Sequence, residues 1–270
     1  MIEIIDDELN PRRNNPAVNI EAPAYERAIN QESIEAAVTY AWNAQRSKED
    51  SPISRNMKGI LGRITKCNYC AGETRTFELF TYLTINIPDD NRPYSLRELF
   101  DLEYGRGEPI DGYTCDSLCK KTGQTASRTT YLCYLPDYLV IQLNRYNAMM
   151  QRVPNTVTFP EKDLDLSRAC VPPGQISQAA DRRLRGPFVY DTYAVTMHKG
   201  NTIKSGHYLT FARSLDKPTH VGSAYGAGQW HLFNDRTVRP AHFVDTQCSS
   251  QSPNGLATVI FLKRKGQPAV

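Results

Sequence analysis

The sequence lacks a long hydrophobic run. No stretch approaches the roughly 18 consecutive apolar residues that a membrane helix needs. The first residues, Met1–Leu9, are acidic, whereas a secretory signal begins with a basic region that leads into an apolar core. We therefore expect no membrane partner and no secretory signal.

The sequence also lacks a strong excess of charge of either sign. Its 270 residues include 32 lysines and arginines against 29 aspartates and glutamates, a formal net charge of +3. Proteins that bind nucleic acids usually carry a basic patch or stripe, and no tract of like charge stands out here. We expect no nucleic-acid partner. The length is sufficient for a sizeable hydrophobic core.

Cysteine is limited to seven residues, and none of them precedes Cys67. An odd number of thiols in a chain of this length, without a secretory signal, fits a reducing compartment better than a framework of disulfides. The predicted location is the cytoplasm, the nucleus or both.

Four of these cysteines form two close pairs, Cys67 with Cys70 and Cys115 with Cys119. Zinc favours four soft or borderline ligands in a tetrahedron, and two short loops can present four thiolates to one ion. A site with four protein ligands is closed, so this zinc would be structural rather than catalytic. Two alternatives stay open: free buried thiols, and a redox pair at Cys67 and Cys70, although no βαβ pattern surrounds that pair.

The apolar pattern predicts more strands than helices. One amphipathic helix is expected over residues 31–45, where apolar residues recur at helical spacing. A capping box at Ser95 and Glu98 predicts a short helix that ends at Leu102. Strands are expected at 60–66, 74–87 and 257–263, two more strands separated by Pro136 at 129–144, and a short helix at 240–245. The remaining proline-rich or polar segments are expected to be a loop or poorly ordered arm at 1–30 and a linker or surface insertion at 170–186.

Residues 190–238 contain a histidine that has a potential polar partner. Alternating apolar residues predict three antiparallel strands in this stretch. Gly206 directly precedes His207 and lets backbone approach the ring closely, and Asn234 and Asp235 end the third strand. A polar side chain there can reach a ring nitrogen and orient the imidazole.

These residues resemble the histidine box of the ubiquitin-specific proteases, a family of papain-like thiol enzymes. The family pattern is Gly-His-Tyr followed by Trp-x-x-Phe-(Asp/Asn)-Asp-x-x-Val. The present sequence has Gly206-His207-Tyr208 and Trp230-His231-Leu232-Phe233-Asn234-Asp235-Arg236-Thr237-Val238. The run from Leu135 to Tyr146 is similar to the family's strand that ends in Leu-x-Arg-Phe, with Asn144 and Tyr146 replacing the commoner Lys and Phe.

The resemblance implies an α+β fold of the papain-like cysteine protease type. Its parts would be a mainly antiparallel β palm, zinc-ribbon fingers and a partial helical thumb. Residues 1–50 would form an N-terminal arm and the remnant of the thumb, and residues 51–265 the fingers and palm. Within that region the fingers would span about 60–135 and the palm 136–265.

The same resemblance implies a role for each candidate residue. His207 would be the general base, Asn234 its orienting residue and Asp235 a neighbouring polar helper. Gly206 and Tyr208 would border the channel for the diglycine tail of ubiquitin, so the implied partners are ubiquitin and ubiquitinated proteins. One structural zinc would staple the fingers. The three-residue spacer between Cys115 and Cys119 departs from the usual two.

The family's nucleophilic cysteine is expected in a Gly-Asn-Thr-Cys box that opens a helix, and this sequence contains no such box. A thiol protease needs a cysteine whose pKa is lowered by a helix N-terminus and a paired histidine. One interpretation is a segment of an active deubiquitinase whose nucleophile lies outside the given sequence. The others are a catalytically inactive ubiquitin-binding module and a zinc-stapled scaffold without affinity for ubiquitin.

Overall fold

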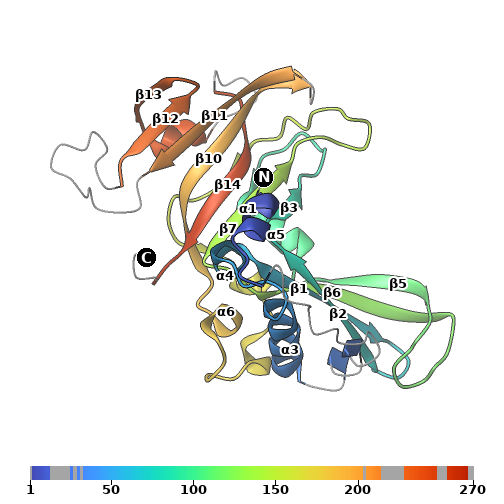
Figure 1. Cartoon of the computed structure of the whole chain (residues 1–270). Coiled ribbons are helices and arrows are strands. Elements are labelled where there is room, and N and C mark those ends of the chain that lie inside the picture. Colours follow the sequence, from blue (N-terminus) through green and yellow to red (C-terminus); the bar gives the residue numbers. More distant parts are fainter. Residues whose placement is uncertain are drawn as a thin grey trace. The chain divides into compact units, whose positions relative to one another are not determined.

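The computed structural model describes residues 2–12, 25–26, 29–30, 33–202, 205–213, 228–247 and 254–266. The chain divides into two compact units, each built from three segments. Figure 1 labels the helices and strands along the chain. Unit 1 comprises Met1–Thr81, Asp101–Asp137 and Leu166–Phe188, and unit 2 comprises Tyr82–Phe100, Tyr138–Asp165 and Val189–Val270. None of the helices in the described ranges is long and apolar enough to cross a membrane.

Unit 1 contains a four-stranded antiparallel sheet. In spatial order its strands are β2 (Glu73–Phe80), β1 (Gly59–Cys67), β6 (Gln124–Tyr134) and β5 (Gly107–Tyr113). The pairing of β1 with β6 is antiparallel, so the β1–β2 and β5–β6 connections come to the same end of the sheet. That end carries the four paired cysteines.

Helix α3 (Ile34–Arg46) provides a large part of the unit 1 core. The Ser33 hydroxyl accepts a hydrogen bond from the Ala36 backbone N–H and caps the first turn. The apolar stripe of the helix is buried, and the Trp42 ring stacks on Tyr134 of β6 with centroids 4.3 Å apart. The predicted helix is confirmed from Ile34 to residue 45, and residues 31–32 lie outside the described ranges.

The segment from Cys170 to Gly186 is not a surface insertion, contrary to the prediction. Val171, Ile176 and Leu184 are buried in the same core cluster as α3. The segment contains a 3-10 turn at Pro173–Gln175 and helix α6 (Arg182–Arg185). The burial was not predicted because the segment is rich in proline and polar residues and its apolar residues follow no regular period.

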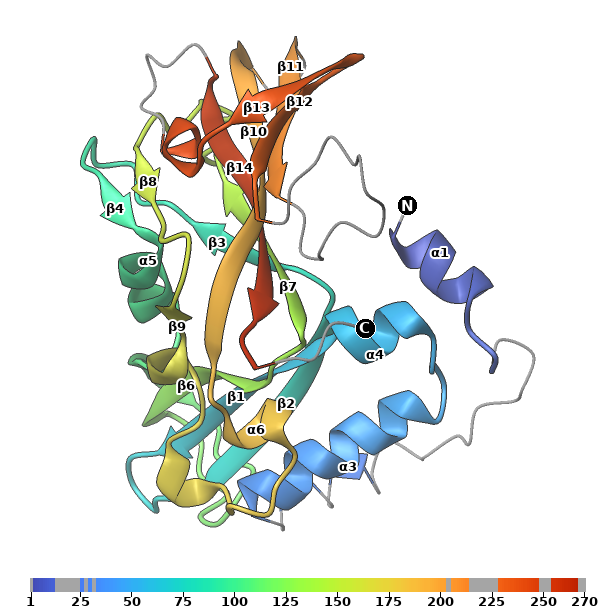
Figure 2. The same ribbon diagram turned by 90° about the vertical axis from the view of Figure 1, so that its left-hand side faces the viewer.

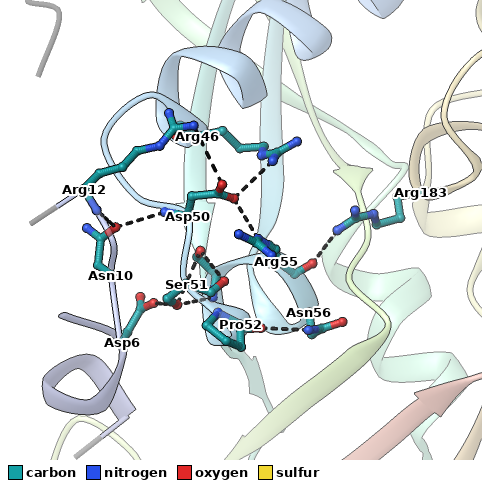
Figure 3. A network of polar contacts seen from close by, with 11 residues as sticks. Asp6, Asn10, Arg12, Arg46, Asp50, Ser51, Pro52, Arg55, Asn56 and Arg183 are labelled. Carbon is teal, nitrogen blue, oxygen red and sulfur yellow. Dashed lines mark hydrogen bonds and ion pairs between the residues drawn. The ribbon is translucent and has the colours of Figure 1, made fainter. Parts of the chain in front are cut away.

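The N-terminal segment includes helix α1 (Ile2–Glu8), which polar contacts fix beside α4 (Pro52–Met57) (Figure 2). The Asp6 carboxylate accepts a hydrogen bond from the Ser51 hydroxyl and lies 2.6 Å from the Lys58 ammonium. Figure 3 shows the hydrogen bond from Ser51 and the neighbouring arginine pairs of Asp50. The predicted loop or poorly ordered arm is wrong for residues 2–8, and residues 13–24 lie outside the described ranges.

Unit 2 contains an eight-stranded sheet. Its main path is β13 (Thr237–Ala241), β12 (Trp230–Asn234), β11 (Ser205–Arg213), β10 (Val189–Thr202), β14 (Leu256–Arg264), β7 (Tyr138–Asn144) and β3 (Leu83–Asn86), and β9 (Leu164–Asp165) pairs with β10. The strands β10, β11 and β12 confirm the three antiparallel strands predicted for residues 190–238. Helix α5 (Leu96–Glu103) begins with the predicted capping box, in which Ser95 and Glu98 exchange hydrogen bonds. The short strands β4 (Tyr94–Ser95) and β8 (Val157–Thr158) pair in parallel.

One strand prediction and one helix prediction need correction. The single strand expected over residues 74–87 is divided, because β2 ends at Phe80 and β3 joins the other sheet, where Leu83 and Ile85 pair in parallel with β7. Both side chains are fully buried there, as is usual for a strand in a parallel pair. The helix expected over 240–245 is a 3-10 turn at Phe243–Thr246, preceded by β13, whose Pro240 is tolerated because β13 is an edge strand.

Candidate active-site histidine and metal centre

The pairing of β11 with β12 brings His207 and Asn234 together. The register sets Thr210 opposite Phe233, and its continuation by one residue sets Asn234 opposite Leu209. His207 lies two residues before Leu209 and therefore on the same face of the sheet, diagonal to Asn234. The distance from His207 Nε2 to Asn234 Oδ1 is 2.5 Å, a hydrogen bond between the two side chains.

This hydrogen bond determines which ring nitrogen of His207 is available for proton transfer. With the amide oxygen of Asn234 as acceptor, the neutral imidazole carries its proton on Nε2. The lone pair of the ring is then on Nδ1, which can accept a proton from an acidic group placed on that side. The imidazole is partly solvent-accessible, with 44% of its side chain exposed.

Asp235 lies near the same ring but makes a weaker contact. Its backbone has φ +50°, in the left-handed region that aspartate tolerates, and it occupies the tight turn between β12 and β13. Its carboxylate is 3.9 Å from His207 Nε2 and 78% exposed. That distance exceeds a hydrogen bond, and solvent screens the charge, so Asn234 is the primary polar partner.

Gly206 and Tyr208 flank His207 in sequence but lie on the other face of β11. Both rest against His198, a residue of β10 that pairs with Tyr208. The rings of His198 and Tyr208 lie 4.5 Å apart, and His198 is only 3% exposed. Sequence reasoning did not single out His198, because its position depends on the register of β10 and β11.

The four predicted metal ligands converge. Cys67 is the last residue of β1, Cys70 lies in the β1–β2 connection, and Cys115 and Cys119 lie in the β5–β6 connection. Their sulfur atoms all lie within 4.8 Å of one another, and the Sγ atoms of Cys70 and Cys115 are 3.6 Å apart. Zinc–sulfur bonds of about 2.3 Å in a tetrahedron place sulfurs about 3.8 Å apart, so the donor set fits one such ion.

The longer spacer of the second cysteine pair does not prevent this convergence. Cys115 closes its loop through a backbone hydrogen bond to the Lys121 carbonyl at 2.9 Å, and Cys67 does the same with Gly72 at 2.9 Å. Burial of Cys115 opposes ionisation, but hydrogen bonds from the backbone of Cys119 and Ser117 outweigh it and lower the pKa of the thiol to about 6. The pKa of Cys119 moves the opposite way, to about 11, because the lowering effect of the hydrogen bond from the Lys121 backbone is outweighed by burial and by the neighbouring thiols. The close thiols therefore do not ionise together, and metal binding has to displace protons from them, because the thiolate is the ligand.

The remaining cysteines differ from an activated nucleophile. Cys133 is fully buried in β6, and burial raises the pKa of its thiol to about 12. Cys170 is 3% exposed, and its thiol donates to the Leu166 carbonyl. All six cysteines in the described ranges belong to unit 1, whereas His207 belongs to unit 2. Cys248 lies outside those ranges.

Comparisons with known proteins agree with the geometry. The family model described as ubiquitin carboxyl-terminal hydrolase matches residues 3–256. Ubiquitin carboxyl-terminal hydrolase 4 of Candida glabrata is 26% identical over 253 residues, which cover 90% of this chain and 27% of that protein. Human ubiquitin carboxyl-terminal hydrolase 21 is 29% identical and covers 74% of this chain and 32% of the human protein. The chain thus spans about a quarter to a third of the length of these relatives.

Solved structures share the fold. The SAGA Ubp8/Sgf11/Sus1/Sgf73 DUB module bound to ubiquitin aldehyde contains a chain that matches with a TM-score of 0.60 at 20% identity, over 85% of this chain and 48% of that one. The same module bound to monoubiquitin matches with a TM-score of 0.61 at 19% identity, over 85% and 48% of the two chains. The predicted α+β fold of the ubiquitin-specific protease type is confirmed.

Proposed function

Because the chain belongs to the ubiquitin carboxyl-terminal hydrolase family, we propose that it forms the ubiquitin-binding and histidine-bearing part of a thiol-dependent deubiquitinase. The substrate would be the peptide or isopeptide bond that follows the C-terminal glycine of ubiquitin. The observation that carries this proposal is the hydrogen bond between His207 Nε2 and Asn234 Oδ1. The relatives bound to ubiquitin and ubiquitin aldehyde support the choice of substrate.

In this proposal His207 acts through Nδ1. It would take the proton of a cysteine thiol, and the thiolate would attack the carbonyl carbon of the terminal glycine. The protonated ring would then give its proton to the leaving amine. Water, deprotonated by the neutral ring, would hydrolyse the acyl-enzyme and release ubiquitin. Asn234 would hold the ring and its tautomer without adding a full charge, as in Cys-His-Asn proteases.

The four-cysteine cluster is proposed to hold one structural zinc. Cys67, Cys70, Cys115 and Cys119 would supply all four ligands, so the ion would leave no open position for substrate. The chemistry that zinc would contribute is cross-linking of the two strand connections in the fingers. Gly206 and Tyr208 are proposed to lie beside the path of the ubiquitin tail.

A second function is favoured by the environment of the thiols. In the described ranges, four cysteines form the cluster and the other two are buried in unit 1. The alternative is therefore a module that binds ubiquitin and hydrolyses nothing. It shares the ubiquitin surface with the first proposal and differs from it only in the nucleophile.

One experiment separates the two. The purified chain would be titrated with ubiquitin and then incubated with ubiquitin that carries a C-terminal electrophile, with His207→Ala as the matched variant. The enzyme proposal, taken with a nucleophile inside the given sequence, predicts a covalent adduct that His207→Ala abolishes, and peptide mapping would identify the attacking cysteine. Saturable binding without an adduct would refute hydrolysis by this chain and support the binding module. Absence of binding up to high micromolar ubiquitin would refute both.

A further inference from the structure

His198 is enclosed by three glycines. A Cβ atom added at Gly206 would lie 2.0 Å from His198 Nε2, and one added at Gly200 would lie 3.2 Å from His198 Cε1. Gly255, at φ +81°, approaches from the start of β14, where an added Cβ would lie 2.3 Å from the His198 carbonyl oxygen. No larger side chain fits at Gly206 without moving either the imidazole or the backbone of β11.

The contacts of His198 lie directly behind the candidate base. Side chains alternate along a strand, so Gly206 and Tyr208 share one face of β11 while His207 projects from the other. Lys199 pairs with His207, and His198 pairs with Tyr208. The residues on both sides of His207 therefore rest on one buried ring. A Cβ added at Gly206 would lie only 2.8 Å from Cε1 of that ring, and the centroid of the Tyr208 ring is 4.5 Å from its centroid.

The His198 backbone is also held. Its carbonyl oxygen accepts a hydrogen bond from Arg152 at 2.9 Å. Burial, together with the positive charge of Arg152, lowers the pKa of His198, so its imidazole is neutral near pH 7. A neutral, flat and fixed ring is a suitable support for Gly206 and Tyr208 on the next strand, β11.

We infer that His198 is a positioning residue for His207: its ring is the surface that fixes Gly206 and Tyr208, and through them the direction in which His207 faces Asn234. This inference rests on the proposed function, because it assigns a role relative to the proposed base. It concerns the orientation of one hydrogen bond and does not require ubiquitin. A residue that merely filled the core would stabilise the sheet without affecting that bond.

The test follows the Nε2 proton of His207 by NMR in the full chain labelled with 15N-histidine. The wild type is expected to show a protected Nε2–H signal and the ring-nitrogen shifts of the Nε2–H tautomer, assigned by its disappearance in His207→Gln. His198→Ala should abolish the protected signal and average the two nitrogen shifts. His198→Phe, which restores a flat ring, should recover the signal.

Two further variants keep the test decisive. His231 is a buried histidine of β12 at 5% exposure, on the opposite face from Asn234, so His231→Ala should lower stability but keep the His207 signal. If His198→Ala does not fold, Gly206→Ala decides, because its methyl group must displace the ring or the strand. An unchanged His207 signal in the folded His198→Ala or Gly206→Ala variant, or equal loss in His231→Ala, would overturn the inference. Because no ubiquitin is present, either result leaves the proposed function to its own test.

Discussion

The metal centre in unit 1 and the histidine site in unit 2 are assembled in different ways. Each cysteine pair lies at the end of one hairpin, Cys67 with Cys70 and Cys115 with Cys119, and one register between β1 and β6 brings the pairs together. The histidine site depends on two registers, that of β10 with β11 and that of β11 with β12. A one-residue slip in a strand moves every side chain to the other face, so the histidine site is the more sensitive to packing.

The largest expected effect is on the metal centre. Cys115→Ser should reduce the zinc content of the purified chain from close to one ion to near zero, because three thiolates and a hydroxyl form a poor zinc site. Structural zinc contributes about 10–16 kcal/mol to folding in small zinc-finger peptides, so a destabilisation of several kcal/mol is expected in unit 1. Elemental analysis and chemical denaturation measure the two effects.

Cys133→Ser is the matched control for the metal centre. Cys133 is a buried cysteine of the same sheet that is not in the cluster, so its variant should lose stability while its zinc content stays unchanged. Unchanged zinc in Cys115→Ser would remove Cys115 from the ligand set. Equal loss of zinc in both variants would attribute the loss to unfolding.

The next effect concerns the strand that carries the histidine. Phe211 is 1% exposed on β11 and lies on the same face as His207 and Leu209. Phe211→Ala should lower the free energy of unfolding by about 3–5 kcal/mol, because a large buried ring is replaced by a cavity. Denaturant unfolding measures the change. Tyr208→Ala, at a 60% exposed position, should cost much less, and the reverse order would contradict the assignment of faces.

The metal centre and the histidine site also differ in how far the sequence alone predicts them. The cysteine cluster was predicted from spacing alone, because a metal site with short ligand spacings leaves a local pattern. A contact of His207 with the Asn234-Asp235 pair was also predicted from the expected strands, and the resemblance then assigned Asn234 rather than Asp235 as the orienting residue. The role of His198 and the separation of β2 from β3 were not predicted, since each depends on which strands become neighbours, and alternation of apolar residues does not specify a neighbour.

The predictions for the two proline-rich segments were wrong for a related reason. The stretch around Pro172 was predicted to be a linker or surface insertion, but its Val171 and Ile176 are buried in a core cluster with residues of α3, β1 and β6. Helix α1 was missed because its stabilising contacts are polar and come from residues more than 40 positions away, such as Ser51 and Lys58. Local propensity carries little information about either case.

A smaller effect distinguishes the two polar partners of His207. Asn234→Ala should abolish the protected Nε2–H signal and lower the free energy of unfolding by only about 0.5–1.5 kcal/mol, the usual net value of one hydrogen bond. Asp235→Ala should leave the signal intact, because its carboxylate is 3.9 Å away and exposed to solvent. Loss of the signal in Asp235→Ala, with retention in Asn234→Ala, would make Asp235 the orienting residue.

The smallest expected effect is the pH dependence that His198 contributes to stability. Its pKa is lowered in the folded chain by burial and by Arg152, so the unfolded chain binds the proton more tightly. The stability that His198 contributes is therefore fully present above its pKa in the unfolded chain, about 6.5. This contribution is lost as the pH falls through the lower pKa of His198 in the folded chain. His198→Phe, which cannot bind a proton, should show a flatter loss of stability between about pH 7 and pH 5 in urea titrations. His207 and the other histidines remain in both proteins, so only the difference between the two curves reports on His198. A wild-type curve no steeper than that of the variant would show that the imidazole is protonated as readily in the sheet as in the unfolded chain.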